Sequence, residues 1–326
     1  MATENWKQAL SEAITSPAQL LASLGLSHTL TSQINEQPDF RCLVPRAYLN
    51  KIQYGNSDDP LLRQILPLAI ENQQTGLLDP VGDLAAMPTD GLLHKYHGRA
   101  LLIATGACAI HCRYCFRRHY PYSEASHTPT AMQAILLYIQ MHNEIEEIIL
   151  SGGDPLILDD EKLAVLISQL ETIPTLTSLR IHTRLPVVLP SRITLQLAQL
   201  LQHSRFRITL VIHANHANEL AKNEQLALKR LHDAGITLLN QSVLLKGIND
   251  DVTSLSNLSK RLHACYTLPY YLHLLDPVQG AMHFDITRQA AMVLMQQLQA
   301  QLPGYLVPRL VKEIAGKTSK TAIFSI

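Results

Sequence analysis

Charge of either sign is scarce in this 326-residue chain, and it is balanced. Charged residues make up 17% of the sequence, with 27 lysines and arginines against 27 aspartates and glutamates. A net charge near zero argues against non-specific electrostatic binding to nucleic acid or to an acidic membrane surface. No apolar run approaches the ~18 residues that a membrane span requires. The opening MATENWKQAL also lacks the features of a secretory signal. We therefore expect a soluble cytoplasmic protein.

Cysteine is also scarce, which argues against a disulfide framework. The chain has five cysteines, an odd number in a large protein, whereas disulfide scaffolds are short and dense in cysteine. Hydrophobic residues make up 47% of the sequence, enough for a large core in one large domain or two modest ones. Three of the cysteines, Cys108, Cys112 and Cys115, fall within eight residues. This cluster is the first informative feature of the chain.

Short β-rich runs alternate with helical patterns from about residue 99 onward. The expected strands span residues 100–104, 147–150, 179–183, 207–212, 236–239 and 270–275. Helical periodicity lies between them, as at Leu163, Ile167 and Leu170, which share one helix face. This alternation predicts βαβ units and a parallel sheet, either an open doubly wound sheet or a partial barrel. Both folds place functional residues at the carboxyl ends of the strands.

The first 90 residues lack this alternation and look helical and irregular. Within them, residues 76–91 contain Asp-Pro, Gly-Asp and Met-Pro steps, which are typical of turns. We interpret that segment as a linker. The sequence therefore predicts a mainly helical region over residues 1–90, followed by an α/β domain over residues 91–326 that carries the chemistry.

The three clustered cysteines have the spacing C-x3-C-x2-C and directly follow the first expected strand. Three thiolates on one loop can each bind one iron of a [4Fe–4S] cluster, which leaves the fourth iron open for another ligand. Two alternatives remain at this point. The cysteines could be three packed thiols, or they could form a zinc site in which His111 or His119 supplies the fourth ligand.

This motif resembles the signature of the radical S-adenosylmethionine (SAM) superfamily. The resemblance implies an α/β fold, a partial (β/α)6 barrel, in which SAM binds the open iron and yields a 5′-deoxyadenosyl radical. A second stretch, residues 147–155, resembles the superfamily's glycine motif, which binds the methionyl amine of SAM. The resemblance assigns to SAM binding the residues Ser151, Gly152, Gly153, Asp154, His213 and Gln241.

Longer segments resemble the lysine 2,3-aminomutase family, and best its short branch, which makes (R)-β-lysine for elongation factor P. The matching segments are residues 58–64, 91–97, 112–119, 180–186, 213–219, 240–245, 269–273 and 304–308. The resemblance implies an isomerase that converts L-lysine to (R)-β-lysine with pyridoxal 5′-phosphate (PLP). It also implies a low-potential reductant, flavodoxin or ferredoxin, and a link to the ligase that attaches β-lysine to elongation factor P.

The resemblance also assigns the PLP site. Counted from residues 305–308, the lysine that holds PLP falls on Lys320, and Lys317 is a rival because it occupies a position where the family has glycine. Phosphate recognition is assigned to Lys95, Tyr96 and Arg99. Of these, Arg99 is the strongest candidate for binding the phosphate, since a guanidinium can hold a phosphate with two parallel hydrogen bonds.

The substrate site follows from the same resemblance. Arg117, the second residue after the third cysteine, is expected to bind the substrate carboxylate, and Asp276 and Glu313 the ε-ammonium of lysine. Glu313 stands where the family's free-lysine enzymes usually carry aspartate. The end of the chain at Ile326 also resembles the short branch. One alternative is a free-lysine aminomutase that serves catabolism or osmolyte synthesis. Another is a non-catalytic regulator that binds an iron–sulfur cluster or zinc.

Overall fold

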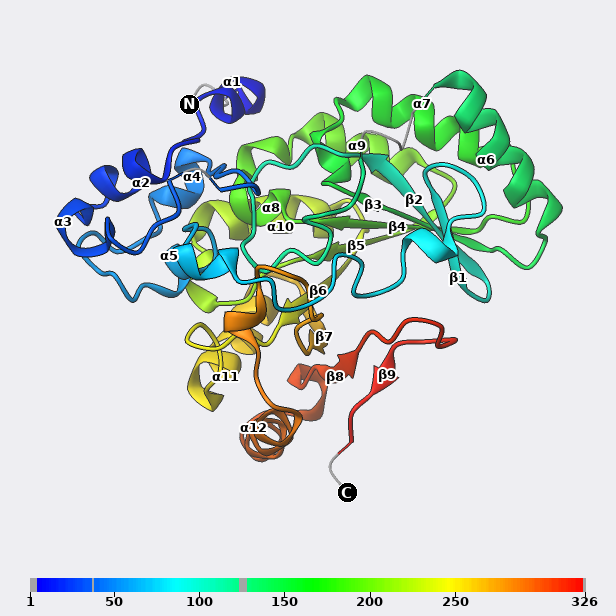
Figure 1. The fold of residues 1–326 in the computed structure, drawn as a ribbon. Helices are drawn as coiled ribbons and strands as arrows, with labels where there is room; N and C mark the ends of the chain where they lie inside the picture. Colours follow the sequence, from blue (N-terminus) through cyan, green and yellow to red (C-terminus); the bar gives the residue numbers. More distant parts are fainter. Residues whose placement is uncertain (1–4, 37, 123–127, 325–326) are drawn as a thin grey trace.

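Seven parallel strands form the centre of the computed structural model, which describes residues 5–36, 38–122 and 128–324 (Figure 1). They belong to a nine-stranded sheet whose strands are neighbours in chain order from β1 to β9. Strands β2 to β8 pair in parallel, and the edge strands β1 and β9 run antiparallel to their neighbours. The strands are β1 (Leu92–Tyr96), β2 (Arg99–Thr105), β3 (Glu147–Gly152), β4 (Ser178–Thr183), β5 (Arg207–Ile212), β6 (Thr237–Val243), β7 (Leu268–His273), β8 (Arg309–Lys312) and β9 (Thr321–Ala322).

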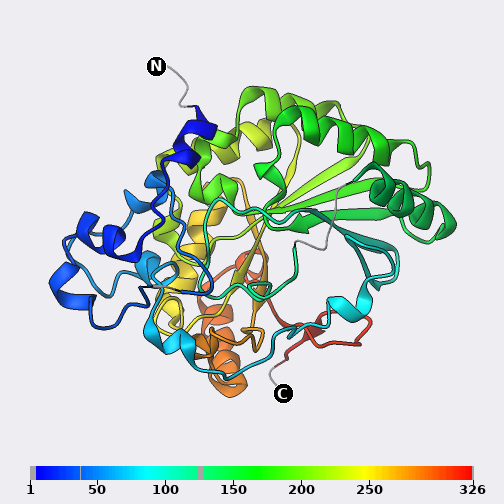
Figure 2. The same cartoon turned by 45° about the horizontal axis from the view of Figure 1, so that its top comes forward.

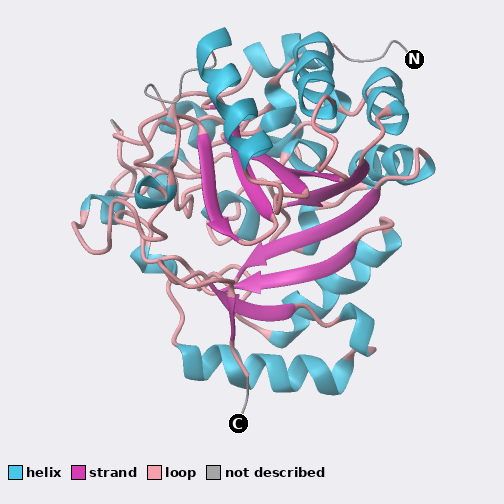
Figure 3. Cartoon of the chain, turned by 90° about the vertical axis from the view of Figure 1, so that its right-hand side faces the viewer, coloured by secondary structure: helices cyan, strands magenta, loops and turns pink. Residues whose placement is uncertain are grey.

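A helix follows each parallel strand from β2 to β7, so that six βα units repeat along the sheet. They contain α6 (Pro129–Met141), α7 (Asp160–Glu171), the short α8 (Leu185–Val188) with α9 (Leu195–His203), α10 (Lys222–Asp233), α11 (Val252–Ala264) and α12 (Arg288–Gln301). In Figure 3 the arrowheads of the long strands point toward the side of the molecule where loops gather. Since β1 and β9 form the two edges of the described sheet, the barrel is partial. This confirms the expected fold.

The helices begin where their capping residues predict. Thr128 caps α6 by accepting a hydrogen bond from the backbone N–H of Ala131, and Pro129 occupies the first helical position. Asp159 caps α7 in the same way. Along α7, Leu163, Ile167 and Leu170 are buried, so the predicted apolar face packs into the core.

All six expected strands are confirmed, as β2 to β7, but the sequence did not predict β1, β8 or β9. These three are edge or short strands, and β9 has only two residues. The expected end of β6 at residue 239 was also wrong, because this strand continues through polar residues to Val243. Asn240 and Ser242 remain in the strand because both are buried and bonded to the carbonyl oxygen of Ala214. Gln241 therefore lies within β6 rather than after it.

Short helices from the N-terminal region cover one flank of the sheet, as Figure 2 shows. They are α1 (Trp6–Ser11), α2 (Pro17–Ser23), α3 (Ser27–Leu30), α4 (Arg46–Leu49) and α5 (Pro60–Arg63). Their buried leucines, such as Leu20 and Leu61, belong to the same apolar cluster as Ile181 and Leu210 of the sheet. Hydrophobic burial therefore joins this region to the barrel. Within the described residues, no helix combines the length and apolarity needed to cross a membrane.

Candidate active site

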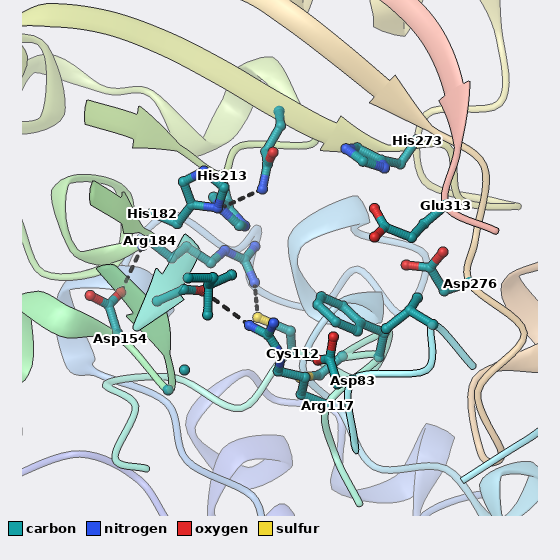
Figure 4. A pocket seen from close by; sticks show the side chains of 18 of the residues that line it. Asp83, Cys112, Arg117, Asp154, His182, Arg184, His213, His273, Asp276 and Glu313 are labelled. Carbon is teal, nitrogen blue, oxygen red and sulfur yellow. Dashed lines mark hydrogen bonds and ion pairs between the residues drawn. The ribbon is translucent and has the colours of Figure 1, made fainter. Parts of the chain in front are cut away.

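A cavity of about 520 Å³ opens at the loop end of the parallel strands, and every site residue expected from the sequence lines it. Figure 4 shows its centre, with Arg117 and Cys112 on one side and Asp276 and Glu313 on the other. The expected residues on its wall are Lys95, Tyr96, Arg99, Cys108, Cys112, Cys115, Arg117, Ser151, Gly152, Gly153, Asp154, His213, Gln241, Asp276, Glu313 and Lys320. The rival Lys317 is exposed and is not among the lining residues.

The cysteine loop follows β2 and packs directly on the glycine turn that follows β3. The N–H of Gly153 donates to the carbonyl of Thr105 at 2.7 Å, and the N–H of Asp154 donates to that of Ala107 at 2.8 Å. A Cβ atom at Gly153 would lie 2.2 Å from the carbonyl oxygen of Ala107, so only glycine fits there. These glycines therefore have a packing role that the sequence did not predict, in addition to any contact with SAM.

The three cysteines suit a cluster better than a single metal ion. In a [4Fe–4S] cluster each thiolate binds a different iron, so the thiols need not converge on one point. In the described part of the chain, no three His, Cys, Asp or Glu side chains could hold one metal ion, so the zinc alternative gains no support. Burial raises the pKa of the Cys115 thiol to about 11, and a bound cation would reverse this shift. Cys42 and Cys265 are buried away from the cavity.

Arg117 is held in the cavity by an aspartate that the sequence did not single out. Its Nε donates to Asp83 Oδ2 at 2.6 Å, and its Nη1 donates to Ser151 Oγ at 3.0 Å. Asp83 also pairs with the Nζ of Lys95 at 2.6 Å. Burial alone would raise the pKa of Asp83, but Arg117 and Lys95 together hold it below its ordinary value. Asp83 thus links the expected carboxylate and phosphate sites.

The same aspartate corrects our interpretation of residues 76–91 as a linker. Asp83 is only 2% exposed, and Leu77 forms a parallel bridge with Val278 in the loop after β7. The segment, which includes the 3-10 helix η2 (Leu84–Ala86), is therefore part of the cavity wall. Its turn-forming residues suggested a connection between domains because the sequence does not reveal which side a loop packs against.

The C-terminal hairpin brings Lys320 into the cavity. Lys312 of β8 pairs with Thr321 of β9, which turns the chain back and directs Lys320 inward. The Nζ of Lys320 lies 2.6 Å from Glu313 Oε2, and the hydroxyl of Tyr96 donates to Glu313 Oε1 at 2.5 Å. Burial opposes ionisation of Glu313, but Lys320 and these hydrogen bonds outweigh it and lower the pKa.

The guanidinium of Arg99, by contrast, has no hydrogen-bond acceptor and no carboxylate partner among the described residues. It lies over the ring of Tyr96, with its central carbon 4.8 Å from the ring centroid. A free cation on the wall of a cavity suits an anionic ligand group such as a phosphate. Arg99 and Tyr96 lie at opposite sides of the turn between β2 and β1, so both come from this antiparallel hairpin and not from the carboxyl end of a parallel strand.

Asp276 is buried without its full set of partners. Its Oδ1 has no hydrogen bond within the described structure. Burial, only partly opposed by nearby Lys320, raises its pKa to about 7. A carboxylate in this state is poised to bind a cation, because a nearby positive charge would favour its ionised form.

His182, His213 and His273 are three of the histidines that line the cavity. His213 accepts a hydrogen bond at Nε2 from Gln241 at 3.0 Å, and burial lowers the pKa of His213 to about 3. The Nε2 atoms of His182 and His273 are buried and have no partner in the described structure. Burial lowers the pKa values of these two histidines as well, so all three imidazoles are neutral at pH 7.

Four further residues line the cavity that were not predicted as site residues, namely Asp83, His182, Arg184 and His273. Arg184 donates from Nη1 to the sulfur of Cys112 at 2.6 Å and from Nη2 to Glu219 at 2.8 Å. His182 and His273 belong to predicted strands, and their inward direction follows from strand alternation. That alternation could have identified them. Asp154, which was assigned to SAM, bonds with its carboxylate to Thr183 and to the backbone of Arg184.

Comparison with known proteins shows which family the chain resembles. Residues 102–255 match the model of the Radical SAM superfamily. The chain is 47% identical to "L-lysine 2,3-aminomutase" of Haemophilus influenzae and 43% identical to that of Escherichia coli, over 98% of this chain and 94–95% of theirs. It is 34% identical to the Clostridium subterminale protein of the same name, over 87% of this chain and 68% of that one.

These matches determine the family and its cofactors. Radical SAM enzymes use a [4Fe–4S] cluster and SAM, and lysine 2,3-aminomutases also use PLP. The cavity offers three thiols for the cluster, a lysine for PLP and a free arginine for its phosphate. The chain therefore belongs to the L-lysine 2,3-aminomutase family of the radical SAM superfamily, and it is an isomerase.

Proposed function

We propose that this enzyme converts L-lysine to (R)-β-lysine, which is then attached to elongation factor P. The proposal is based on one observation: the three clustered cysteines, the Lys320–Glu313 pair and Arg117 all line the same cavity. A radical source and a group that can hold an amino acid must lie together if a hydrogen atom is to pass between them. Ligands that fill the cavity would also keep water away from the reacting atoms.

Cys108, Cys112 and Cys115 would bind the cluster. Ser151, the two glycines of the turn and Asp154 would lie beside SAM, together with His213 and Gln241. When bound, the cluster and SAM supply a 5′-deoxyadenosyl radical that takes a hydrogen atom from the substrate. The protein's own contribution is to keep the loop and the glycine turn in contact through the backbone bonds of Gly153 and Asp154.

Lys320 would hold PLP, with the phosphate bound by Arg99, Lys95 and Tyr96. An amine must be neutral to react with the aldehyde of PLP. Glu313 Oε2, at 2.6 Å from the Nζ of Lys320, is the nearest group that can take its proton. Arg99 would contribute most to phosphate binding, because Lys95 already pairs with Asp83.

Arg117 would bind the substrate carboxylate, and Asp276 and Glu313 its ε-ammonium. Asp83 and Ser151 occupy the Nε and one N–H of Nη1, which leaves the other guanidinium N–H groups for the substrate. The two ends of lysine are thus expected on opposite sides of the cavity, because Figure 4 shows Arg117 apart from Asp276 and Glu313. Such a site selects for a long amino acid with a cationic tip.

The attachment to elongation factor P rests on likeness to the short branch of the family. Identity is higher to the Haemophilus influenzae and Escherichia coli proteins, at 47% and 43%, than to the longer Clostridium subterminale protein, at 34%. The competing proposal is that free β-lysine serves catabolism or osmolyte synthesis. For either role, cluster reduction requires a low-potential donor, and we propose flavodoxin or ferredoxin.

Product analysis tests this proposal. The enzyme is incubated anaerobically with L-lysine, SAM and dithionite, and the product is identified by chiral amino-acid analysis. The product is then offered to elongation factor P with its ligase, and the mass of the acceptor protein is measured. We expect (R)-β-lysine. Because β-lysine and α-lysine are isomers and add the same mass, the readout is the fraction of acceptor modified, which should be larger with the product than with α-lysine. The (S) enantiomer, or a product that the ligase does not use, would favour the competing role.

Replacing Asp276 by alanine should lower kcat/KM for lysine by ~100-fold or more. Truncating one partner of a buried charge pair typically costs roughly 3–5 kcal/mol, because the other charge remains buried without compensation. SAM binding and the PLP absorption spectrum should remain intact. The exposed Asp285 gives a matched control, and Asp285→Ala should retain normal turnover. Near-normal lysine turnover by the Asp276→Ala, Glu313→Ala double variant would refute the ammonium site.

The raised pKa of Asp276 predicts a specific pH dependence. Below about pH 7 this carboxyl is protonated in the free enzyme, and a neutral acid binds an ammonium weakly. kcat/KM for lysine should therefore fall as the pH falls through about 7, approaching tenfold per pH unit. kcat should change less, since bound lysine lowers the pKa of Asp276. Asp276→Asn should lack this acid limb, and a wild-type profile that is flat from pH 5.5 to 8 would contradict the assignment.

A further inference from the structure

Two of the histidines on the cavity wall, His182 and His273, have no role in the function proposed so far, and His273 lies nearer the two carboxylates. His273 is the last residue of β7, and its Nε2 is buried without a hydrogen-bond partner in the described structure. A buried polar atom without a partner destabilises a protein, so native structures rarely retain one. The Oδ1 of Asp276 is a second such atom on the same cavity wall. Other orphaned atoms, such as Nε2 of His182, also line the cavity. His273 and Asp276, however, lie on the side of the cavity that holds Glu313, so their orphaned atoms point to one ligand that bonds both.

Strand register brings His273 beside the two carboxylates. His273 pairs with Val311 of β8, so the side chains of these two residues point to the same face of the sheet. Glu313 lies two residues beyond Val311 and continues on that face. Asp276 follows His273 by three residues. Figure 4 shows His273, Glu313 and Asp276 on one side of the cavity.

The acceptors that Asp276 and Glu313 offer are too few for an ammonium group. A primary ammonium has three N–H donors. Glu313 already accepts from Tyr96 at Oε1 and pairs with Lys320 at Oε2. That leaves Asp276 as the main open acceptor. The three N–H groups of an ammonium point in different directions, so one carboxylate cannot meet all of them and a further acceptor is expected on another side. His273 supplies it, because burial and the nearby cation Lys320 keep its imidazole neutral and one ring nitrogen free to accept.

We propose that His273 is a substrate-binding residue whose Nε2 accepts a hydrogen bond from the ε-ammonium of lysine. This inference rests on the proposed function, because it assumes lysine as the substrate. It requires the proton of the imidazole to reside on Nδ1. His273 would add to specificity without adding charge. The ammonium would be bound by Asp276, Glu313 and His273, and an uncharged side chain of the same length would leave all three without a partner.

The test compares two amino acids that differ only at the tip. Binding of L-lysine and L-norleucine is measured in the anaerobic holoenzyme from the change in PLP absorbance, for wild type, His273→Phe and His273→Gln. Phenylalanine removes the acceptor and keeps a ring, whereas glutamine retains an acceptor. We expect His273→Phe to weaken lysine binding by roughly 10- to 100-fold, as for a lost bond to a charged group. Norleucine binding should be unchanged, and His273→Gln should restore part of the lysine affinity.

Controls separate this role from folding and from the function itself. His283 also has a buried Nε2 without a partner but does not line the cavity, so His283→Phe should leave the lysine-to-norleucine ratio unchanged. Iron and PLP contents confirm that each variant is loaded. Unchanged lysine binding in His273→Phe, an equal loss for both amino acids, or loss of PLP would overturn the proposal. Failure of wild type to form β-lysine would instead overturn the proposed function.

Discussion

Alanine at Cys108, Cys112 or Cys115 is expected to abolish the iron–sulfur cluster and all turnover. Each thiolate would bind its own iron, so the loss of any one exposes a second iron and leaves the cluster without a stable protein attachment. After anaerobic reconstitution, iron content and the visible absorption of the cluster should fall to background in all three variants. The effect should be this large because no other described cysteine lines the cavity.

Cys42 and Cys265 provide the matched controls. Both are buried in the apolar core, and burial raises the pKa of the Cys42 thiol to about 11, so it remains a protonated packing residue. Cys42→Ala and Cys265→Ala should therefore bind as much iron as wild type. Wild-type iron content in one of the three loop variants, or loss of the cluster in Cys42→Ala, would contradict the assignment.

Replacing Lys320 by alanine should prevent covalent attachment of PLP and reduce turnover to background. Lys320 is the lysine of the C-terminal hairpin that enters the cavity, where it pairs with Glu313. Borohydride reduction fixes PLP to its lysine, and peptide mapping then locates it. In wild type the label should be nearly stoichiometric and confined to Lys320, and in Lys320→Ala it should be lost.

Lys317 serves as the control for this experiment. It lies only three residues earlier, but it is exposed and does not line the cavity. Lys317→Ala should retain full labelling of Lys320 and near-normal turnover. A pyridoxyl label on Lys317, or normal labelling of Lys320→Ala, would show that the other lysine of the tail holds the cofactor.

The alternation of strands and helices was enough to predict βαβ units and a parallel sheet, and the resemblance to the radical SAM superfamily selected the partial barrel over an open sheet. The apolar face of α7 is a local feature, and the structure buries it as expected. The cysteine loop also follows its strand as expected. The edge strands could not be predicted, because four residues of β8 and two of β9 are too few for a periodic pattern.

Contacts between residues that are far apart in the chain could not be predicted from the sequence. Asp83 lies in a turn-rich segment, and its contact with Arg117 spans 34 positions. Gln241 was expected beyond a strand that in fact contains it, because buried hydrogen bonds from Asn240 and Ser242 sustain β6. Strand alternation could have placed His273 on the cavity face, but its position beside Glu313 depends on the register of β7 with β8.

Transfer of deuterium tests most directly the central claim that one cavity holds both the radical source and the bound lysine. Holoenzyme is incubated anaerobically with dithionite, SAM and L-lysine that carries deuterium at C3, and the products are examined by mass spectrometry. If the cysteine loop and Lys320 serve the same reaction, deuterium should pass to the 5′ carbon of SAM and return to C2 of β-lysine. β-Lysine that carries only solvent hydrogen at C2, with no deuterium in SAM, would contradict the account.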